Sequence, residues 1–232
     1  MEHIEKLNKI LLSENVVSEF HNKYAEDSFR SWLLSIIPEI EECKNQQQDN
    51  PWHIYNCLDH ILHSVEEMNK LSKHLDEHTR LILSFVMFLH DTGKPECYVR
   101  RFRKNYGREV DGFFNHQIAS HKIAKRVLSK FGFDENDSKI ISKLVLKHDM
   151  FMLLTLDPQN KNQYKKLLTP RVLEDEIEKL NEVGNGLQLM EYLIMVGRSD
   201  TLAQNPKMTK KSLELNFKMK EMLENLKITR NI

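Results

Sequence analysis

An imidazole and a carboxylate stand side by side at His90 and Asp91, directly after an apolar segment from Leu81 to Leu89. This segment is apolar on all sides except at Ser84, which predicts a buried helix with the His-Asp pair at its end. A buried, ionised carboxylate is costly unless a partner compensates its charge. A divalent metal ion is one such partner. The other interpretation is a capped turn beside a hydrogen-bonded core histidine.

Two further residues of the same chemical types lie on helix faces that should be buried. His60 shares the apolar face of a helix predicted over 54–73, and Asp200 lies one turn beyond Val196 in an apolar helix predicted over 187–204. A core histidine, and a salt bridge from Asp200 to a cation of another helix, are the alternatives. Imidazoles and carboxylates without thiolates suit Mn, Fe, Co, Ni, Zn or Mg.

The elements that must position these side chains are helices. Apolar spacing predicts helices over 3–13, 26–43 (bent at Pro38), 54–73, 78–90, 114–131, 134–148, 171–182, 187–204 and 208–226. No segment sustains the two-residue alternation of a strand, and residues 92–112 look irregular, with a basic loop over 100–108. We expect one all-α domain, a single helical bundle with extra terminal helices. The last amphipathic helix is interpreted as a packing or homodimer-forming element.

The composition narrows the class of protein. Basic and acidic residues number 34 each among 232, so no overall field attracts nucleic acid or an anionic membrane, and phosphate recognition must be local. The three cysteines lack CxxC spacing, which suits reduced thiols. No apolar run approaches the length of a membrane span, and the charged N-terminal segment is unlike a signal peptide. We therefore expect a cytoplasmic protein with no membrane partner.

The ordered set His60, His90-Asp91 and Asp200 resembles the ligand pattern of the HD-domain metal phosphohydrolase superfamily. Further blocks are similar to the HD domain of bacterial CCA-adding tRNA nucleotidyltransferases. These blocks are the segment from Ile37 to His60, His90-Asp-Thr-Gly-Lys-Pro, Gly112-Phe-Phe-Asn-His116 and Arg198-Ser-Asp200-Thr-Leu-Ala-Gln-Asn. No Gly-Ser phosphate loop or Asp-x-Asp pair precedes them, so we expect neither a nucleotidyltransferase head nor CCA polymerase activity.

The resemblance covers residues 37–205 and implies an HD domain there. A helical extension over 1–36 would precede this domain, and an amphipathic helix over 206–232 would pack on it. The resemblance also implies that His60, His90, Asp91 and Asp200 bind a divalent metal ion.

In relatives with two ions, histidines at positions such as His116 and His148 hold the second one. The alternative is that both histidines line the pocket and bind phosphate as imidazolium. One or two ions are therefore expected.

Other side chains are candidates for contact with a substrate. Lys94 follows Asp91 by three residues, so its ammonium could stabilise charge on a phosphoryl group, and the resemblance favours this role over that of an exposed turn lysine. As a block, the basic loop is more typical of a solvated surface, yet we expect at least one of its cations to contact substrate or a nucleic-acid backbone. The remaining candidates for substrate contact are His63, Arg100, Arg101, Arg103 and His121.

Two functional hypotheses follow. The first is a metal-dependent phosphohydrolase, either a phosphomonoesterase or a phosphodiesterase, in which Asp91 and Lys94 are catalytic. By resemblance it would act on a nucleotide, a 2′,3′-cyclic phosphate or an RNA end through a metal-activated water. The second is a non-catalytic helical module that binds RNA or nucleotides and has a structural metal site. Cyclic-dinucleotide hydrolysis of the HD-GYP kind is disfavoured, because the Gly-Tyr-Pro signature is missing.

Overall fold

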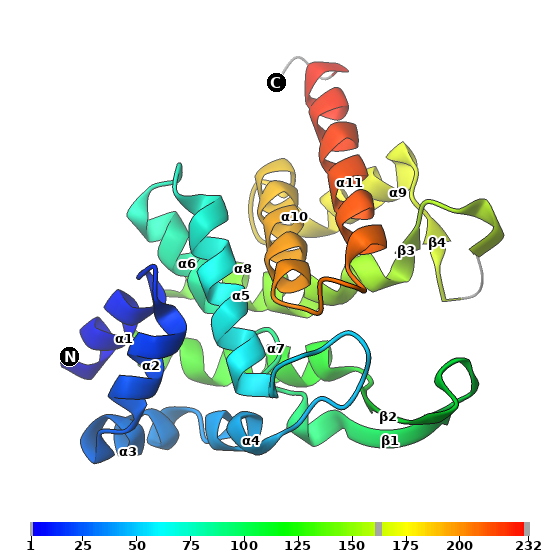
Figure 1. The fold of residues 1–232 in the computed structure, drawn as a ribbon. Coiled ribbons are helices and arrows are strands. Elements are labelled where there is room, and N and C mark those ends of the chain that lie inside the picture. The colour runs from blue at the N-terminus through cyan, green and yellow to red at the C-terminus, as the bar shows by residue number, and fades with distance from the viewer. Residues whose placement is uncertain (1, 161–163, 230–232) are drawn as a thin grey trace.

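Helices dominate the computed structural model, which describes residues 2–160 and 164–229 and confirms the all-α prediction (Figure 1). The α-helices in this part of the chain are α1 (Glu2–Leu11), α2 (Val16–Tyr24), α3 (Asp27–Ile36), α4 (Glu39–Asn45), α5 (Cys57–Ser72), α6 (Glu77–Leu89), α7 (His116–Val127), α8 (Glu135–Lys147), α9 (Pro170–Leu180), α10 (Gly186–Leu202) and α11 (Lys210–Thr229).

Three helices that pack on one another form the centre of the bundle: α5, α6 and α10. Each begins with a side-chain cap on a backbone amide, supplied by Asn56, Asp76 and Asn185 respectively. Such caps satisfy amides that have no partner within the helix and so fix where the helix starts. Because α5 and α10 meet α6 near its C-terminal end, the predicted ligands of all three helices lie in one place.

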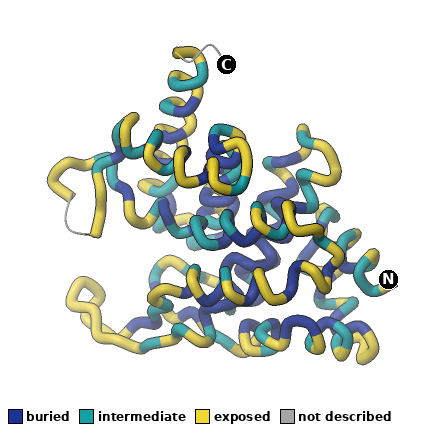
Figure 2. Tube along the Cα trace, turned by 180° about the vertical axis from the view of Figure 1, so that it is seen from behind, coloured by how far each residue is buried: buried dark blue, intermediate teal, exposed yellow. Residues whose placement is uncertain are grey.

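A single hydrophobic cluster runs through the molecule and includes side chains from α1 to α11. Its aromatic centre is Phe85, whose ring contacts those of Phe88, Phe131 and Phe133. The inward helix faces form a continuous buried layer, while exposed residues concentrate on the outer turns and loops (Figure 2). Since this one core contains residues from 1–36, 37–205 and 206–229, the division into three segments stays a prediction; residues 230–232 lie outside the described part.

Residues 92–112, which the sequence presented as irregular, contain an antiparallel hairpin, so that prediction was wrong. Strand β1 (Tyr98–Arg103) pairs with β2 (Arg108–Phe113), and Gly107 closes the turn with a φ of 62°. Almost every side chain of β1 is exposed, so the strand has no apolar face to produce a two-residue alternation. A second, very short parallel pair joins β3 (Leu154–Thr155) and β4 (Lys166–Leu167).

The N-terminal helices also differ from the prediction. The single bent helix expected over 26–43 is two helices, α3 and α4, because Pro38 stands as the N-cap of α4 rather than inside a helix. Helix α2 was not predicted, although Val16, Phe20 and Tyr24 follow helical spacing and are all buried.

At the other end, α11 packs on α9 and α10 through buried Leu215, Met219 and Leu223, while Phe217 stays exposed. The homodimer stays a prediction. None of the helices in the described ranges is long and apolar enough to cross a bilayer.

Candidate metal centre

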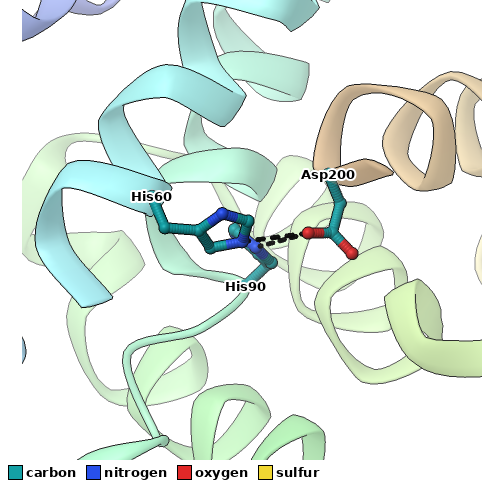
Figure 3. Close-up of side chains that lie close together, drawn as sticks. All are labelled: His60, His90 and Asp200. Atoms are coloured by element: carbon teal, nitrogen blue, oxygen red, sulfur yellow. Dashed lines mark ion pairs between the residues drawn. The ribbon is translucent and has the colours of Figure 1, made fainter. Parts of the chain in front are cut away.

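Side chains from three helices converge where α5, α6 and α10 meet (Figure 3). His60 projects from the buried face of α5, His90 caps the C-terminus of α6, and Asp200 comes from the last turns of α10. The Oδ1 atom of Asp200 lies 2.9 Å from Nε2 of His60 and 3.8 Å from Nε2 of His90. Both histidines are fully buried, whereas the Asp200 side chain keeps 20% exposure. These three side chains offer ligand atoms within 4.8 Å of one another.

A second group adjoins the first and consists of Asp91, His116 and His148, again with ligand atoms within 4.8 Å of one another. His116 begins α7, and His148 caps α8. The Oδ1 atom of Asp91 lies 3.0 Å from Nε2 of His116 and 3.6 Å from Nε2 of His148.

The other oxygen of Asp91 faces the first group. Its Oδ2 atom lies 3.2 Å from Nε2 of His60 and 3.2 Å from Nε2 of His90. One carboxylate therefore presents one oxygen to each group.

The hydrogen bonds of the histidines determine which ring atoms remain available. Nδ1 of His90, His116 and His148 lies 2.6–2.7 Å from the carbonyls of Met87, Phe113 and Val145 respectively. His60 makes a longer contact of 3.4 Å with the carbonyl of Ala203. An Nδ1–H that donates to a carbonyl leaves Nε2 as an unprotonated lone pair, which is the form that binds metals.

The centre consequently contains acceptors that face acceptors. The Nε2 atoms of His60 and His90 and the Oδ2 atom of Asp91 are buried without a well-directed hydrogen bond. Nε2 of His116 lies 3.0 Å from Nε2 of His148, although both have a lone pair there in the tautomers above. Lone pairs that converge in this way require a proton or a cation between them. The donor set, nitrogen and oxygen without sulfur, fits a divalent metal ion and does not fix its identity.

The pKa shifts of the centre's side chains also indicate a site for positive charge. Burial opposes charge on His90, but Asp91 and Asp200 raise its pKa to about 10. Burial also opposes ionisation of Asp91, yet His90 and Lys94 hold its pKa well below the usual range. His60 and His90 likewise lower the pKa of Asp200 against the effect of burial. The site thus favours two ionised carboxylates and attracts positive charge.

Lys94 is buried in the centre and does not extend from an exposed turn. Its Nζ atom lies 2.5 Å from Oδ2 of Asp91, donates to Oε1 of Gln48 at 2.8 Å and is 3.2 Å from Nε2 of His53. Burial, followed by the positive charge of Lys94, lowers the pKa of His53, so this imidazole is neutral and can accept from the ammonium. Lys94 therefore pairs with Asp91, and its contact with substrate stays a prediction.

The turn that carries Asp91 is fixed from two sides. The buried thiols of Cys57 and Cys43 donate to the carbonyls of Asp91 and Thr92, at 3.6 and 3.8 Å. On the opposite side, the amide of Gly93 donates to Oγ of Ser120 at 2.9 Å. These contacts hold the carboxylate between α5 and α7.

The other predicted substrate residues do not join the two groups. Nδ1 of His63 lies 3.3 Å from Glu66, and this histidine lines a small surface hollow with Tyr55 and Gln204. His121 binds the carbonyl of Ser142 on α8 at 2.7 Å. Both contacts are compatible with structural roles, and a role in substrate binding stays a prediction for each.

The arginines of β1 divide into two kinds. Arg100 forms ion pairs with Asp49 and Asp111, at 2.9 and 2.7 Å. Arg101 and Arg103 are exposed and lie over the ring of Phe114. Arg100 therefore belongs to an ion-pair network, whereas Arg101 and Arg103 form no ion pair with the described residues; substrate contact stays a prediction for all three.

Sequence reasoning expected His53 at the mouth of the pocket but assigned no role at this centre to Gln48 and Asp149. Gln48 and His53 contact Lys94 from the loop between α4 and α5. Asp149 lies 3.7 Å from Nε2 of His116 and, against the effect of burial, raises the pKa of that histidine. The position of Asp149 directly after His148 was the only available signal. Gln48 had none, because its position depends on tertiary contacts.

No family model matches the chain, and the comparison with curated proteins gives distant relatives. Three relatives are each named bifunctional uridylyltransferase/uridylyl-removing enzyme. The protein of Erythrobacter litoralis is 22% identical over 183 residues, or 73% of this chain. Those of Cereibacter sphaeroides and Nitrobacter hamburgensis are 26% and 22% identical, over 50% and 70% of this chain. The chain spans only 17%, 12% and 16% of these relatives' lengths.

The similarity to these relatives supports the predicted HD superfamily only loosely. They give no support to the predicted link with CCA-adding enzymes, because all three names refer to a different activity.

Proposed function

We propose that this chain is an HD-type metal-dependent phosphohydrolase that binds two divalent ions. His60, His90 and Asp200 would hold one ion, His116 and His148 would hold the other, and Asp91 would contribute one oxygen to each. The observation that carries the proposal is the placement of the two Asp91 oxygens, with Oδ2 facing His60 and His90 and Oδ1 facing His116 and His148.

Bound ions of this kind supply Lewis acidity, which lowers the pKa of water and neutralises charge on a phosphoester. The chain's own residues orient the centre. The ammonium of Lys94 fixes Asp91 and adds positive charge beside the centre. Asp149, whose side chain is 24% exposed, lies 3.7 Å from Nε2 of His116 and 4.0 Å from Nε2 of His148.

The substrate is proposed to be a nucleotide, a 2′,3′-cyclic phosphate or an RNA end. A uridylyl group is a nucleoside monophosphate, so its removal by the distant relatives breaks a phosphoester bond. That chemistry supports a phosphoester substrate for this chain.

The test is hydrolysis of these three substrate classes by the purified protein with Mn, Co, Ni, Fe, Zn or Mg. Asp91→Asn should abolish turnover. Asp59→Asn is the matched control, because Asp59 is the neighbour of His60 but pairs with His21 at 2.6 Å, outside both groups. Hydrolysis that persists in Asp91→Asn would refute the proposal. Nucleotide or RNA binding that is unchanged in that variant, without hydrolysis in the wild type, would favour the non-catalytic module.

A further inference from the structure

The hairpin of β1 and β2 separates its charges between two faces. In the register of the pair, Arg100 lies opposite Asp111 and Phe102 opposite Glu109, so both acidic residues of β2 share the face of Arg100. The other face carries Arg101, Arg103 and, opposite Arg103, Arg108. On the first face Arg100 is paired with both acidic residues, whereas the second face has only basic and apolar residues.

Of the three arginines on the second face, Arg108 is bound to Asp49, whereas Arg101 and Arg103 have no acidic partner in the described part of the chain. Among the residues that the structure describes, no carboxylate pairs with Arg101 or Arg103, although the neighbouring Arg100 and Arg108 are both bound to Asp49. Their guanidinium carbons lie 4.7 and 5.7 Å from the centre of the Phe114 ring.

Phe114 is held against this face as an exposed platform. Its side chain is 47% exposed. A Cβ atom placed on Gly112 would lie 3.2 Å from the Phe114 ring, so the glycine lets the ring approach the strand closely. Exposed aromatic rings are costly in water and mark ligand surfaces when they occur with unpaired cations.

Phe114 is close in the chain to a residue of the proposed metal centre. Phe114 precedes His116 by two residues, and the carbonyl of Phe113 accepts the hydrogen bond that orients the His116 ring. A second exposed aromatic group, made of Trp52 and Tyr106, lies at the hairpin's turn, with the two ring centres 5.7 Å apart. Trp52 is the neighbour of His53, which contacts Lys94. Both aromatic groups are thus joined to residues of the centre.

We infer that this face of the hairpin binds single-stranded RNA next to the proposed metal centre. Arg101 and Arg103 would contact successive phosphates, and an unstacked base would lie on Phe114. Residues two apart on one strand are about 6.6–6.8 Å apart, a spacing that suits neighbouring phosphates of an extended strand. Aromatic rings and guanidinium planes are the usual platforms for bases of single-stranded RNA. The inference rests on the proposed function in one respect, because it makes an oligonucleotide the substrate of that centre.

The test is fluorescence anisotropy of the full chain with a labelled single-stranded RNA of about 12 nucleotides. Loss of two phosphate contacts in Arg101→Ala/Arg103→Ala should reduce the slope of log affinity against log salt by about 1.4, which is roughly 25-fold in affinity at about 0.1 M salt. Phe114→Ala should weaken binding by roughly 5- to 150-fold, as expected for one stacked base.

The matched control is Lys210→Ala/Lys211→Ala, an equal change of charge at exposed positions at the start of α11. Its RNA affinity should stay close to that of the wild type. Circular dichroism and thermal unfolding verify that all variants fold.

Equal losses in the two double variants would overturn the inference, since the attraction would then be diffuse. Tighter binding of duplex RNA, of the matching DNA strand or of an acidic peptide would overturn it as well.

Parallel hydrolysis assays separate this inference from the proposed function. Metal-dependent hydrolysis of a mononucleotide by a chain that does not bind RNA would contradict the inference alone. RNA binding that depends on Arg101 and Arg103, in a chain that hydrolyses no phosphoester, would contradict the proposed function alone.

Discussion

Replacement of Lys94 by methionine tests the electrostatics of the centre most sharply. Lys94 is 4% exposed, and its ammonium lies 2.5 Å from Oδ2 of Asp91, which is itself 2% exposed. Methionine keeps most of the side-chain volume and removes the charge, so Asp91 loses a partner in a buried environment. Removal of one partner from a buried ion pair costs about 3–5 kcal/mol. At roughly 2–4 °C per kcal/mol for a chain of this size, Tm should fall by about 6–20 °C.

The assay is thermal unfolding of the metal-free protein and of the protein saturated with Mn²⁺ or Zn²⁺. A bound ion also compensates Asp91, so added metal should reduce the difference between Lys94→Met and the wild type by at least half. The matched control is Lys147→Met, which breaks a surface-proximal pair with Glu176 at 2.7 Å. It should cost about 1 kcal/mol or less, with or without metal. The reasoning is refuted if Lys94→Met costs no more than the control, or if metal leaves its cost unchanged.

Two further predictions concern the packing of the centre and the pH dependence of stability. In Gly93→Ala the new Cβ would lie 2.5 Å from both the Cβ of Ala119 and the backbone nitrogen of Ser120, so α7 and the Asp91 turn must separate. The free energy of unfolding, measured in urea, should fall by roughly 1–3 kcal/mol. A variant as stable as the wild type would show that the close approach is wrong. Burial opposes the ionisation of Glu176, but Lys147 and Lys179 lower its pKa below 4.5. Its contribution to stability is therefore complete above about pH 4.5 and is lost as pH falls through the lower, folded-state pKa. The free energies of unfolding of Glu176→Gln and the wild type should differ at neutral pH and converge on acidification, and a difference that grows towards low pH would contradict this sign.

The helical part of the fold and the main side chains of the centre were predictable from the sequence. His60 follows the buried stripe of α5, and His90 and Asp91 follow the all-apolar α6, so helical periodicity alone placed them at the core. Asp200 could be placed in the same way, because α10 is apolar around most of its circumference.

Other parts depend on contacts that a linear pattern does not contain. The hairpin was missed because an exposed strand has no buried face to produce alternation. The contact of Gln48 with Lys94 requires the loop before α5 to lie against β2, where the Asp49 carbonyl accepts from the amide of Asp111 at 3.0 Å. The burial of Lys94 follows from these contacts, and it excludes the alternative of an exposed lysine in a Gly-Lys-Pro turn.

The most direct test of the central claim is the number of ions bound, measured by elemental analysis after metal-free protein is equilibrated with Mn²⁺ and dialysed. Two ions are predicted for the wild type and one each for His60→Ala and His116→Ala, because each variant weakens one group only. None is predicted for Asp91→Ala, because this substitution removes one carboxylate oxygen from each group. Full occupancy in Asp91→Ala, or no bound metal in the wild type, would contradict the account.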